Sequence, residues 1–267
     1  MTGKIYFIGA GPGDPELLTL KGRRLIGEAD LVIYADSLVH PGIRAFARPD
    51  AEIVGSASLT LEEVWARMET ACAAGQTVAR VHSGDPSLYG ALHEQLVRCE
   101  AAGIPYEIVP GVSSAFAAAA VLGAELTVPG IAQTVIFTRR PSRTDRPANE
   151  DLRALASHGA TLVLFLSVAA MSAVVADLRA GGYPPETPVA VVYRATWEDQ
   201  VVLRGTLADI AARVRAARFT KQALVLVGPA LDPALRQHAA DRRSHLYSAD
   251  FSHLYRQVRR QEDSGGE

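Results

Sequence analysis

A glycine- and proline-rich loop near the start of the chain has the residue types to hold a small ligand. The segment 9–15 reads Gly-Ala-Gly-Pro-Gly-Asp-Pro and follows the apolar run 4–9. Nucleotide-like ligands dock at such a loop between a first strand and a first helix. The dinucleotide fingerprint is broken here, because Asp14 takes the third glycine position and Pro12 and Pro15 have no N–H to donate. We predict close approach of a ligand or a second chain segment, without pyrophosphate binding.

Two more clusters of polar residues follow predicted strands, at the ends where ligands bind in such sheets. Asp36 ends the second strand, and we interpret it as a ribose ligand, a catalytic base or a solvated loop residue. In the segment 82–89, Gly84 permits close backbone approach. Asp85 either accepts a hydrogen bond from a ligand or caps the next helix, as Ser87 would.

Serines and arginines supply two further candidate groups. Ser113 and Ser114 follow Pro110-Gly111 at a predicted helix start, where they cap the helix or contact a ligand carboxylate. The segment 138–146 carries four arginines, whose planar guanidinium groups bind carboxylates in pairs of hydrogen bonds. It indicates either a polyanionic substrate or a solvated charged loop, with the arginines at 139, 140, 143 and 146.

The sequence lacks the residue patterns that metal sites, disulfide frameworks and nucleophilic catalysis require. Cys72 and Cys99 both fall in predicted helices, and the histidines show no ligand spacing. We therefore predict no metal site and no disulfide framework. The sequence holds no Walker loop, nucleophile elbow or Cys–His signature, and we interpret Tyr193 and Trp197 as packing residues.

The elements that must position these residues alternate between strand and helix, which predicts an α/β fold. We predict two α/β domains at 1–125 and 133–231 with a ligand site between them, and a C-terminal tail at 232–267. Predicted strands are 4–9, 31–34, 76–82, 106–109, 133–138, 160–166, 188–193, 200–203 and 222–227. Predicted helices are 16–27, 61–74, 88–101, 114–122, 169–180 and 207–217. In the tail, we expect Tyr247, Phe251 and Tyr255 to pack on the body.

The composition narrows the class of protein. The 267 residues are 48% hydrophobic with a mean hydropathy of +0.09 and a formal charge of −2, which is typical of a globular chain and gives no general reason to expect nucleic acid. The apolar run 115–122 is too short to span a bilayer, so no membrane association is expected. Without a signal-peptide pattern or disulfides, we expect a cytoplasmic protein.

Taken together, the motifs resemble the tetrapyrrole (corrin/porphyrin) methyltransferases. The resemblance rests on the segments 9–20, 34–39, 82–86 and 110–115 and extends from Lys4 to about Leu231. It implies two α/β domains, S-adenosylmethionine (SAM) bound between them, a tetrapyrrole substrate and a homodimer. Gly55-Ser-Ala-Ser-Leu-Thr60 lacks the Gly-Lys-Arg type of segment found in uroporphyrinogen-III methylases, which favours a later corrin intermediate as the substrate.

The resemblance also assigns residues. It places Pro12 and the 83–88 and 113–114 segments against the cofactor, and it adds two positions from the second domain. Leu166 stands where the family often has methionine, a change between apolar side chains of similar volume. The cofactor residues implied are Pro12, Ser83, Gly84, Asp85, Leu88, Ser113, Ser114, Leu166 and Ala195.

The implied reaction transfers a methyl group from a sulfonium to an electron-rich ring carbon, so the enzyme mainly aligns the reactants and excludes water. We hypothesise that Asp36 handles a proton or anchors a pyrrole N–H. A second hypothesis is that Arg139, Arg140 or Arg143 binds the substrate carboxylates.

Two other classes of function remain as alternatives. A nicotinamide-dependent oxidoreductase is suggested by the glycine-rich loop and Asp36, and opposed by Pro12, Asp14 and Pro15. The other alternative is a tetrapyrrole carrier without catalysis. The sequence leaves open whether the ring contains cobalt.

Overall fold

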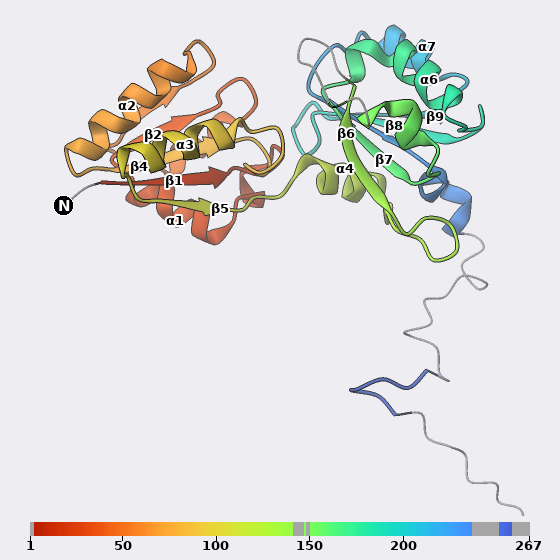
Figure 1. Cartoon of the computed structure of the whole chain (residues 1–267), viewed down its shortest axis with the longest axis horizontal. Helices are drawn as coiled ribbons and strands as arrows, with labels where there is room; N and C mark the ends of the chain where they lie inside the picture. Colours follow the sequence, from red (N-terminus) through yellow and green to blue (C-terminus); the bar gives the residue numbers. More distant parts are fainter. Residues whose placement is uncertain (1–2, 141–146, 148–149, 237–250, 258–267) are drawn as a thin grey trace, which may run out of the picture.

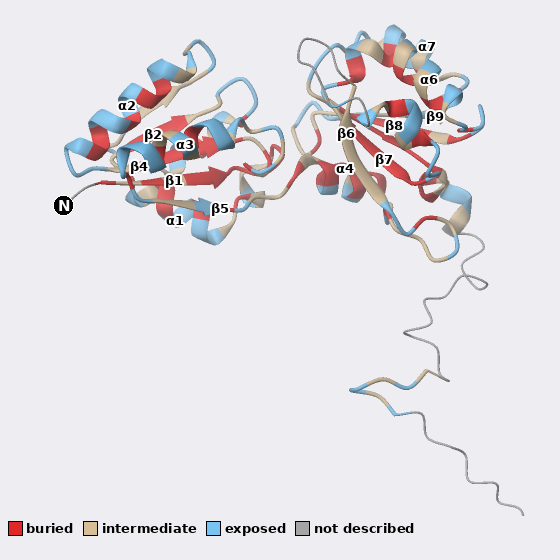
Figure 2. Ribbon diagram, in the orientation of Figure 1, coloured by how far each residue is buried: buried red, intermediate tan, exposed pale blue. Residues whose placement is uncertain are grey.

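The structure, a computed structural model, describes residues 3–140, 147, 150–236 and 251–257. This part of the chain forms two units, each built around a five-stranded sheet, as Figure 1 shows. Both sheets are buried between layers of helices, whose outer faces are exposed (Figure 2). The two-unit α/β architecture expected from the alternating pattern is confirmed.

All strand pairs of the first sheet are parallel, and the strand order is β3-β2-β4-β1-β5. From β1 the chain crosses toward the β3 edge of the sheet to form β2, and from β4 it crosses toward the opposite edge to form β5. The neighbours β1 and β4 therefore form a topological switch point, where ligands bind in open parallel sheets. The strands are β1 (Lys4–Gly9), β2 (Leu31–Tyr34), β3 (Glu52–Gly55), β4 (Thr77–His82) and β5 (Tyr106–Val109).

Helices cover both faces of this sheet. Helix α1 (Leu20–Glu28) and the 3₁₀ segment Pro41–Phe46 pack on one face, and α2 (Leu61–Ala73) and α3 (Leu92–Ala102) pack on the other. The strands alternate between the two cores, because successive side chains point to opposite faces. In β4, Val78 faces α2 and α3 while Ala79 and Val81 face α1. By the same alternation, positions 80 and 82 belong to the α2 and α3 side.

The second sheet is mixed, with the order β6-β7-β10-β8-β9. Strands β6 and β7 are parallel, whereas β10 runs antiparallel between β7 and β8, and β8 and β9 pair in antiparallel fashion. Its strands are β6 (Val135–Arg139), β7 (Thr161–Phe165), β8 (Pro188–Tyr193), β9 (Val201–Thr206) and β10 (Ala223–Val227). One face is covered by α5 (Leu152–Ala156), α6 (Met171–Ala180) and α7 (Ile210–Ala217).

The other face of the second sheet is covered by the alanine-rich helix α4 (Ser114–Leu122). Its buried residues, including Ala115 and Leu122, share one core with Val163, Val192 and Leu226 of the sheet. The predicted domain boundary lies between 123 and 133, C-terminal to this helix. The helix nevertheless packs beside the second sheet and not the first (Figure 1).

Four predicted helices begin later in the structure than expected. Those predicted from 169 and 207 begin at Met171 and Ile210, and the other two begin four residues late. The helix predicted from 16 is a 3₁₀ turn, Pro15–Leu17, followed by extended Leu18 and then by α1, which Thr19 caps. The helix predicted from 88 begins at Leu92, because Tyr89 and Ala91 have left-handed φ angles of 55° and 47°. Apolar periodicity continued through both segments, whereas the backbone turns at each.

The tail prediction is wrong for Tyr255, which is 91% exposed. Phe251 is half-buried, and its ring lies 6.2 Å from that of His253. Tyr247 lies outside the described residues. Across the described ranges, no helix has the length and apolar character that crossing a membrane requires.

Candidate functional site

Three glycines bring the ends of β1, β4 and β5 into backbone contact. A Cβ at Gly9 would lie 2.6 Å from the Gly84 carbonyl oxygen, and one at Gly111 would lie 2.2 Å from that same oxygen. No side chain fits at such distances, so each position requires glycine. The loops after all three strands therefore start from one point beside the switch point of the sheet.

The loop 9–15 makes its hydrogen bonds to protein. Gly11 and Gly84 exchange backbone hydrogen bonds of 2.8 and 3.2 Å, and Ala10 N–H donates to the His82 carbonyl. Asp14 N–H donates to Thr196 Oγ1 of the second unit at 3.0 Å. These N–H groups are already used, so the loop has no nest of free donors for a pyrophosphate. The predicted approach of a second chain segment is what the loop shows.

Asp85 connects two of these loops. Its Oδ2 accepts from Gly111 N–H at 2.9 Å, while Oδ1 accepts from the backbone N–H and the hydroxyl of Ser87. Desolvation raises the pKa of this carboxyl, but the hydrogen bonds from Ser87 and Gly111 outweigh it and hold the pKa below its usual range. Asp85 is thus a charged group that fixes the loops.

The other first-unit candidates lie on the same loops. Ser113 is buried, and its Oγ accepts from Ala115 N–H as the N-cap of α4, while Ser114 is the first helical residue. Ser83 and Leu88 are half-buried in the segment that follows β4. The loops after β4 and β5 therefore bring all four residues to the carboxyl edge of the first sheet.

Asp36 is exposed just beyond β2 and is held by the segment after β3. Its Oδ1 accepts from Ala57 N–H at 2.7 Å. A Cβ at Gly55 would lie 2.7 Å from its Cγ, so glycine makes room for the carboxylate. The second carboxylate oxygen makes no hydrogen bond within the described residues.

The loop 194–200 of the second unit reaches the glycine-rich loop of the first. Trp197 Nε1 donates to the Pro12 carbonyl at 3.1 Å, and the indole lies against Gly13, where a Cβ would be 2.3 Å from its ring. The Arg194 guanidinium lies 4.0 Å from the centre of that ring, and the His40 ring lies 4.9 Å from it. Trp197 packs as predicted, and it also contacts the candidate cofactor loop.

We call the region where the two units meet the junction; it comprises segments 12–14, 36–40, 89–91, 165–166, 194–200 and 222. Arg139 of the second unit lies beside it, and Phe165 is the junction residue that faces Tyr89. The Arg139 guanidinium lies 6.0 Å from the centre of the Tyr89 ring, and the Phe165 ring lies 5.2 Å from it. Gln222 Nε2 donates to the Ser37 carbonyl.

The candidate arginines separate into two kinds. Arg140 forms an ion pair with Asp177 at 2.9 Å, and its N–H donates to Ser167 Oγ. Arg139 forms no ion pair with any carboxylate of the described residues. Arg139 therefore has a guanidinium free for an anionic ligand. Arg143 and Arg146 lie outside the described residues.

Backbone strain is concentrated at the junction. Among the described residues other than glycine, left-handed φ angles include those of Tyr89, Leu166, Arg194, Thr196 and Gln222, all in junction segments. Thr196, at φ 70°, is β-branched, for which this conformation is unfavourable. Strain of this kind gathers at functional sites, where the surrounding structure holds it.

The second-unit candidates and Pro12 belong to this region. Leu166 follows β7 and is 68% exposed, so its apolar side chain is available to a ligand. Ala195 and Pro12 are buried, in the two loops that Trp197 joins. Tertiary packing thus brings the candidate cofactor residues to the facing edges of the two units.

A buried histidine, His82, ends β4 directly before the candidate cofactor segment 83–88. His82 is 3% exposed, and its Nε2 is a buried atom with no partner in the described structure. Burial lowers its pKa to about 3, the charge of Arg80 adds to the drop, and a hydrogen bond with the Gly90 backbone opposes it. The imidazole is therefore neutral at physiological pH.

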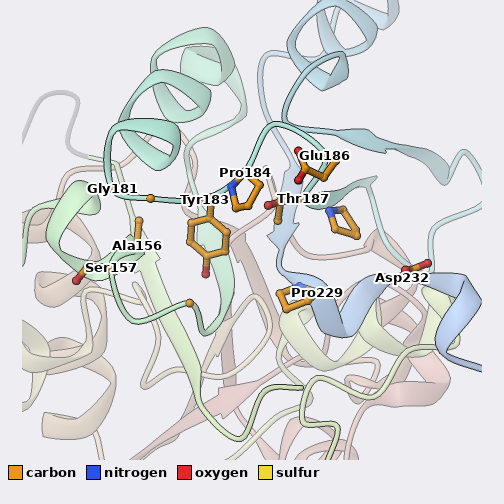
Figure 3. A pocket seen from close by; sticks show the side chains of 12 residues that line it. Ala156, Ser157, Gly181, Tyr183, Pro184, Glu186, Thr187, Pro229 and Asp232 are labelled. Atoms are coloured by element: carbon orange, nitrogen blue, oxygen red, sulfur yellow. The ribbon is translucent and has the colours of Figure 1, made fainter. Parts of the chain in front are cut away.

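A cavity of about 460 Å³ lies at the opposite end of the second sheet (Figure 3). Tyr183, Glu186 and Asp232 line it, and its lining contains no lysine or arginine. Its acidic groups do not suit a polycarboxylate, and none of the candidate residues lines it. Within the described residues, no cluster of three His, Cys, Asp or Glu side chains is arranged to hold a metal.

Sequence reasoning missed three contributors to this site. Thr196 has no sequence signal, because the hydrogen bond that it accepts from Asp14 forms only where the second unit meets the first. His40 shares no metal-ligand spacing with the other histidines, yet it contacts Trp197 and Glu198. Arg80 did carry a signal, since it is a charged residue inside an otherwise apolar strand.

Comparison with known proteins decides the family. The sequence model of the tetrapyrrole (corrin/porphyrin) methylases matches residues 4–211, most of the chain. The chain belongs to the tetrapyrrole methylase family. Membership confirms the resemblance drawn from the four loop motifs.

Among curated members of this methylase family, full-length relatives have two related names. A cobalt-precorrin-4 C(11)-methyltransferase of Methanocaldococcus jannaschii is 48% identical, with 95% of this chain and 96% of the relative covered. A precorrin-4 C(11)-methyltransferase of Pseudomonas aeruginosa is also 48% identical, with coverages of 94% and 98%.

Solved methylase structures match the whole fold. One is described as a cobalamin biosynthetic enzyme, cobalt precorrin-4 methyltransferase; its TM-score is 0.84 at 47% identity, with 86% of this chain and 96% of that chain covered. A uroporphyrin-III C-methyltransferase of Thermus thermophilus, complexed with S-adenosyl homocysteine, has a TM-score of 0.73 at 31% identity, with coverages of 86% and 99%.

Proposed function

We propose that this chain is a SAM-dependent C-methyltransferase that methylates C11 of precorrin-4 to give precorrin-5 in cobalamin biosynthesis. The observation that carries the proposal is similarity over nearly the full length to relatives named for this step. The sequence features that set the chain apart from first-step methylases, such as Gly55-Ser-Ala-Ser-Leu-Thr60, support a later intermediate.

The junction fits SAM better than a dinucleotide. The N–H groups of Ala10, Gly11 and Asp14 in the glycine-rich loop donate to protein acceptors, so few donors remain for a pyrophosphate. With these donors occupied, the loop does not repel a cationic sulfonium. The residues that would hold SAM are Pro12, Ser83, Gly84, Asp85, Leu88, Ser113, Ser114, Leu166 and Ala195. When bound, SAM supplies an electrophilic methyl group. A nicotinamide-dependent oxidoreductase is correspondingly disfavoured, and we expect no stabilisation by NADH.

The chain's own residues would orient and protect the reactants. The strained loops at Tyr89, Leu166 and Thr196 hold the facing edges of the two units at fixed positions. Orientation of two bound reactants can lower the activation free energy by roughly 7–11 kcal/mol. The reaction therefore does not require a catalytic triad or a covalent nucleophile. Arg139, which forms no ion pair within the described part of the chain, would bind an acetate or propionate group of the ring.

The function is tested by mass spectrometry of freshly generated precorrin-4 incubated with the protein and SAM. We expect a gain of one methyl group, which NMR would place at C11. No gain, with S-adenosylhomocysteine still bound in calorimetry, would retain a SAM-binding methylase and reject this step. Binding of the ring with no methylation of any corrin intermediate would instead support a carrier.

The same assay distinguishes metal-free from cobalt-containing rings. Relatives named for the cobalt form are 48% and 47% identical to this chain, and relatives named for the metal-free form reach 48% and 52%. These identities do not separate the alternatives. Parallel reactions with precorrin-4 and cobalt-precorrin-4 compare kcat/KM directly, and a higher value for the cobalt ring would replace our proposal with that alternative.

Replacement of Asp36 by Asn tests its proposed role. The amide keeps an acceptor for Ala57 N–H but removes the negative charge. If Asp36 handles a proton, we expect kcat to fall on the order of 100-fold with unchanged affinity for S-adenosylhomocysteine. Turnover at the full rate would reject this role.

We also propose a homodimer, following the family resemblance. Light scattering of the purified chain would measure its mass, and a mass of 28.4 kDa, that of one chain, would contradict the proposal.

A further inference from the structure

Arg80 is a buried cation in the middle of β4. Its side chain is 9% exposed, and no carboxylate of the described residues forms an ion pair with it. Burial lowers its pKa to about 10, so the guanidinium is still charged at neutral pH. An uncompensated buried charge costs stability, and apolar side chains of similar volume commonly stabilise such positions more. Stability alone therefore does not account for Arg80.

One side of the guanidinium holds the ends of β2 and β3. Nη1 donates to the Ile33 carbonyl at 3.3 Å and to Ser56 Oγ at 3.2 Å. Ser56 in turn donates to the Tyr34 carbonyl through both its backbone N–H and its hydroxyl. Arg80 thus fastens the segment after β3 to the end of β2.

That fastened segment is the one that holds Asp36. Ala57, the residue after Ser56, donates its N–H to Asp36 Oδ1 at 2.7 Å, and Gly55 lies directly below the carboxylate. Only Ser56 and one peptide unit separate the Arg80 guanidinium from the donor that fixes Asp36.

The other side of the guanidinium holds the segment after β4. Nε donates to Gln95 Oε1 at 3.2 Å, and Gln95 Nε2 donates to the Ala91 carbonyl at 2.9 Å. Gln95 is 2% exposed, and Ala91 starts α3 in a left-handed conformation without a side-chain cap. Arg80 therefore supports the strained end of the segment that begins with Ser83, Gly84 and Asp85.

We propose that Arg80 is a positioning residue that sets the placement of Asp36 relative to the 83–91 segment. This inference rests on the proposed function, which requires a proton-handling group and a cofactor loop in fixed register. A rigid guanidinium suits the role because its donors diverge in a plane, whereas a lysine ammonium fixes no such angle.

The experiment breaks the two sides separately in the full-length protein. Ser56→Ala removes the side-chain acceptor on the Asp36 side and leaves the Ile33 carbonyl, and Gln95→Met removes the link to Ala91. Arg80→Met removes both, and Arg80→Lys keeps the charge without the fork. The matched control is Thr161→Val, because Thr161 is fully buried and donates one hydrogen bond to a carbonyl, that of Leu126, at the far end of the second sheet.

We expect the two sides to affect different quantities. Ser56→Ala lowers kcat roughly tenfold and leaves the Kd of S-adenosylhomocysteine within about twofold, because only Asp36 shifts. Gln95→Met mainly weakens S-adenosylhomocysteine binding. Arg80→Met lowers kcat and also weakens S-adenosylhomocysteine binding. Arg80→Lys does not return either quantity to its wild-type value. Thr161→Val lowers Tm and changes neither kcat nor the Kd of S-adenosylhomocysteine.

The proposal is overturned if Ser56→Ala and Gln95→Met both leave kcat and the Kd of S-adenosylhomocysteine unchanged, as Thr161→Val does. If Arg80→Met does not fold, these two single-sided variants still decide between the outcomes. Hydrogen exchange separates this outcome from failure of the proposed function. If the wild type does not methylate precorrin-4, faster exchange in Arg80→Met at both 34–38 and 83–91, absent in Thr161→Val, still supports the positioning role. Unchanged exchange at both segments rejects it.

Discussion

At the scale of single residues, the site depends on which polar groups remain unused. Asp85, Ser113 and Arg140 have motif positions as suggestive as those of Asp36 and Arg139. Their polar atoms are engaged by Gly111, Ala115 and Asp177, so they fix the loops. Among the described residues, one Asp36 carboxylate oxygen makes no hydrogen bond and Arg139 forms no ion pair, which makes these two the best candidates for contact with the substrate.

Arg139→Ala is expected to raise KM for the tetrapyrrole about tenfold or more, because a charge-assisted hydrogen bond contributes roughly 1.5–3 kcal/mol. Tm should change little, since Arg139 forms no ion pair among the described residues. Steady-state kinetics and a thermal melt measure the two effects. Arg140→Ala is the matched control and should show the reverse, a lower Tm through loss of the ion pair with Asp177. Unchanged KM in Arg139→Ala would count against carboxylate binding.

The buried neutral imidazole of His82 should make the unfolding free energy depend on pH in the acid range. Its pKa is about 3 in the folded chain and near 6.5 when unfolded, so the unfolded state binds the extra proton between these values. Stability conferred by the neutral imidazole is complete above pH 6.5, and the unfolding free energy should fall by about 1.4 kcal/mol per pH unit toward pH 3. Denaturant melts of wild type and His82→Gln across this range measure the difference. Parallel pH profiles for the two proteins would contradict the assignment.

At the scale of elements, the three loops of the first sheet are fixed by backbone contact among glycines. Gly111→Ala places a Cβ 2.2 Å from the Gly84 carbonyl oxygen, and we expect a loss of about 3 kcal/mol with weaker S-adenosylhomocysteine binding. Gly103→Ala is the control, because its φ of 64° is strained but open space surrounds it, so it should cost only about 1 kcal/mol. Urea unfolding measures both, and equal losses would show that the contact can relax.

At the scale of the whole molecule, the junction works through a few contacts between the units. Trp197 contacts Gly13, Pro12 and His40 of the first unit, and Thr196 accepts from Asp14. The loop 194–200 therefore links the second sheet to the glycine-rich loop of the first. A ligand bound between the units would depend on this link.

Trp197→Ala should weaken S-adenosylhomocysteine binding at least tenfold, because the 12–14 loop loses both its packing partner and a hydrogen bond. Trp197→Phe keeps the ring and loses only the hydrogen bond, so it should weaken binding about threefold. Isothermal calorimetry gives both values. A Kd unaffected by Trp197→Ala would place the cofactor away from this loop.

The sequence by itself determined the local structure. The strands 31–34, 106–109 and 188–193 have the predicted bounds, because short runs of strand-forming residues end at turn residues. The predicted cap at Ser113 follows from a side chain that bonds within a few residues. The glycine motifs located the edge of the sheet that carries the candidate site.

The tertiary structure alone decided what each motif residue does. The packing of α4 on the second sheet and the contact of Thr196 with Asp14 depend on residues distant in sequence. Asp85 is occupied because Gly111 lies 26 residues away along the chain and within hydrogen-bond distance in space. Local periodicity contains no such information, since which donors meet which acceptors is set by packing of the sheets and the junction.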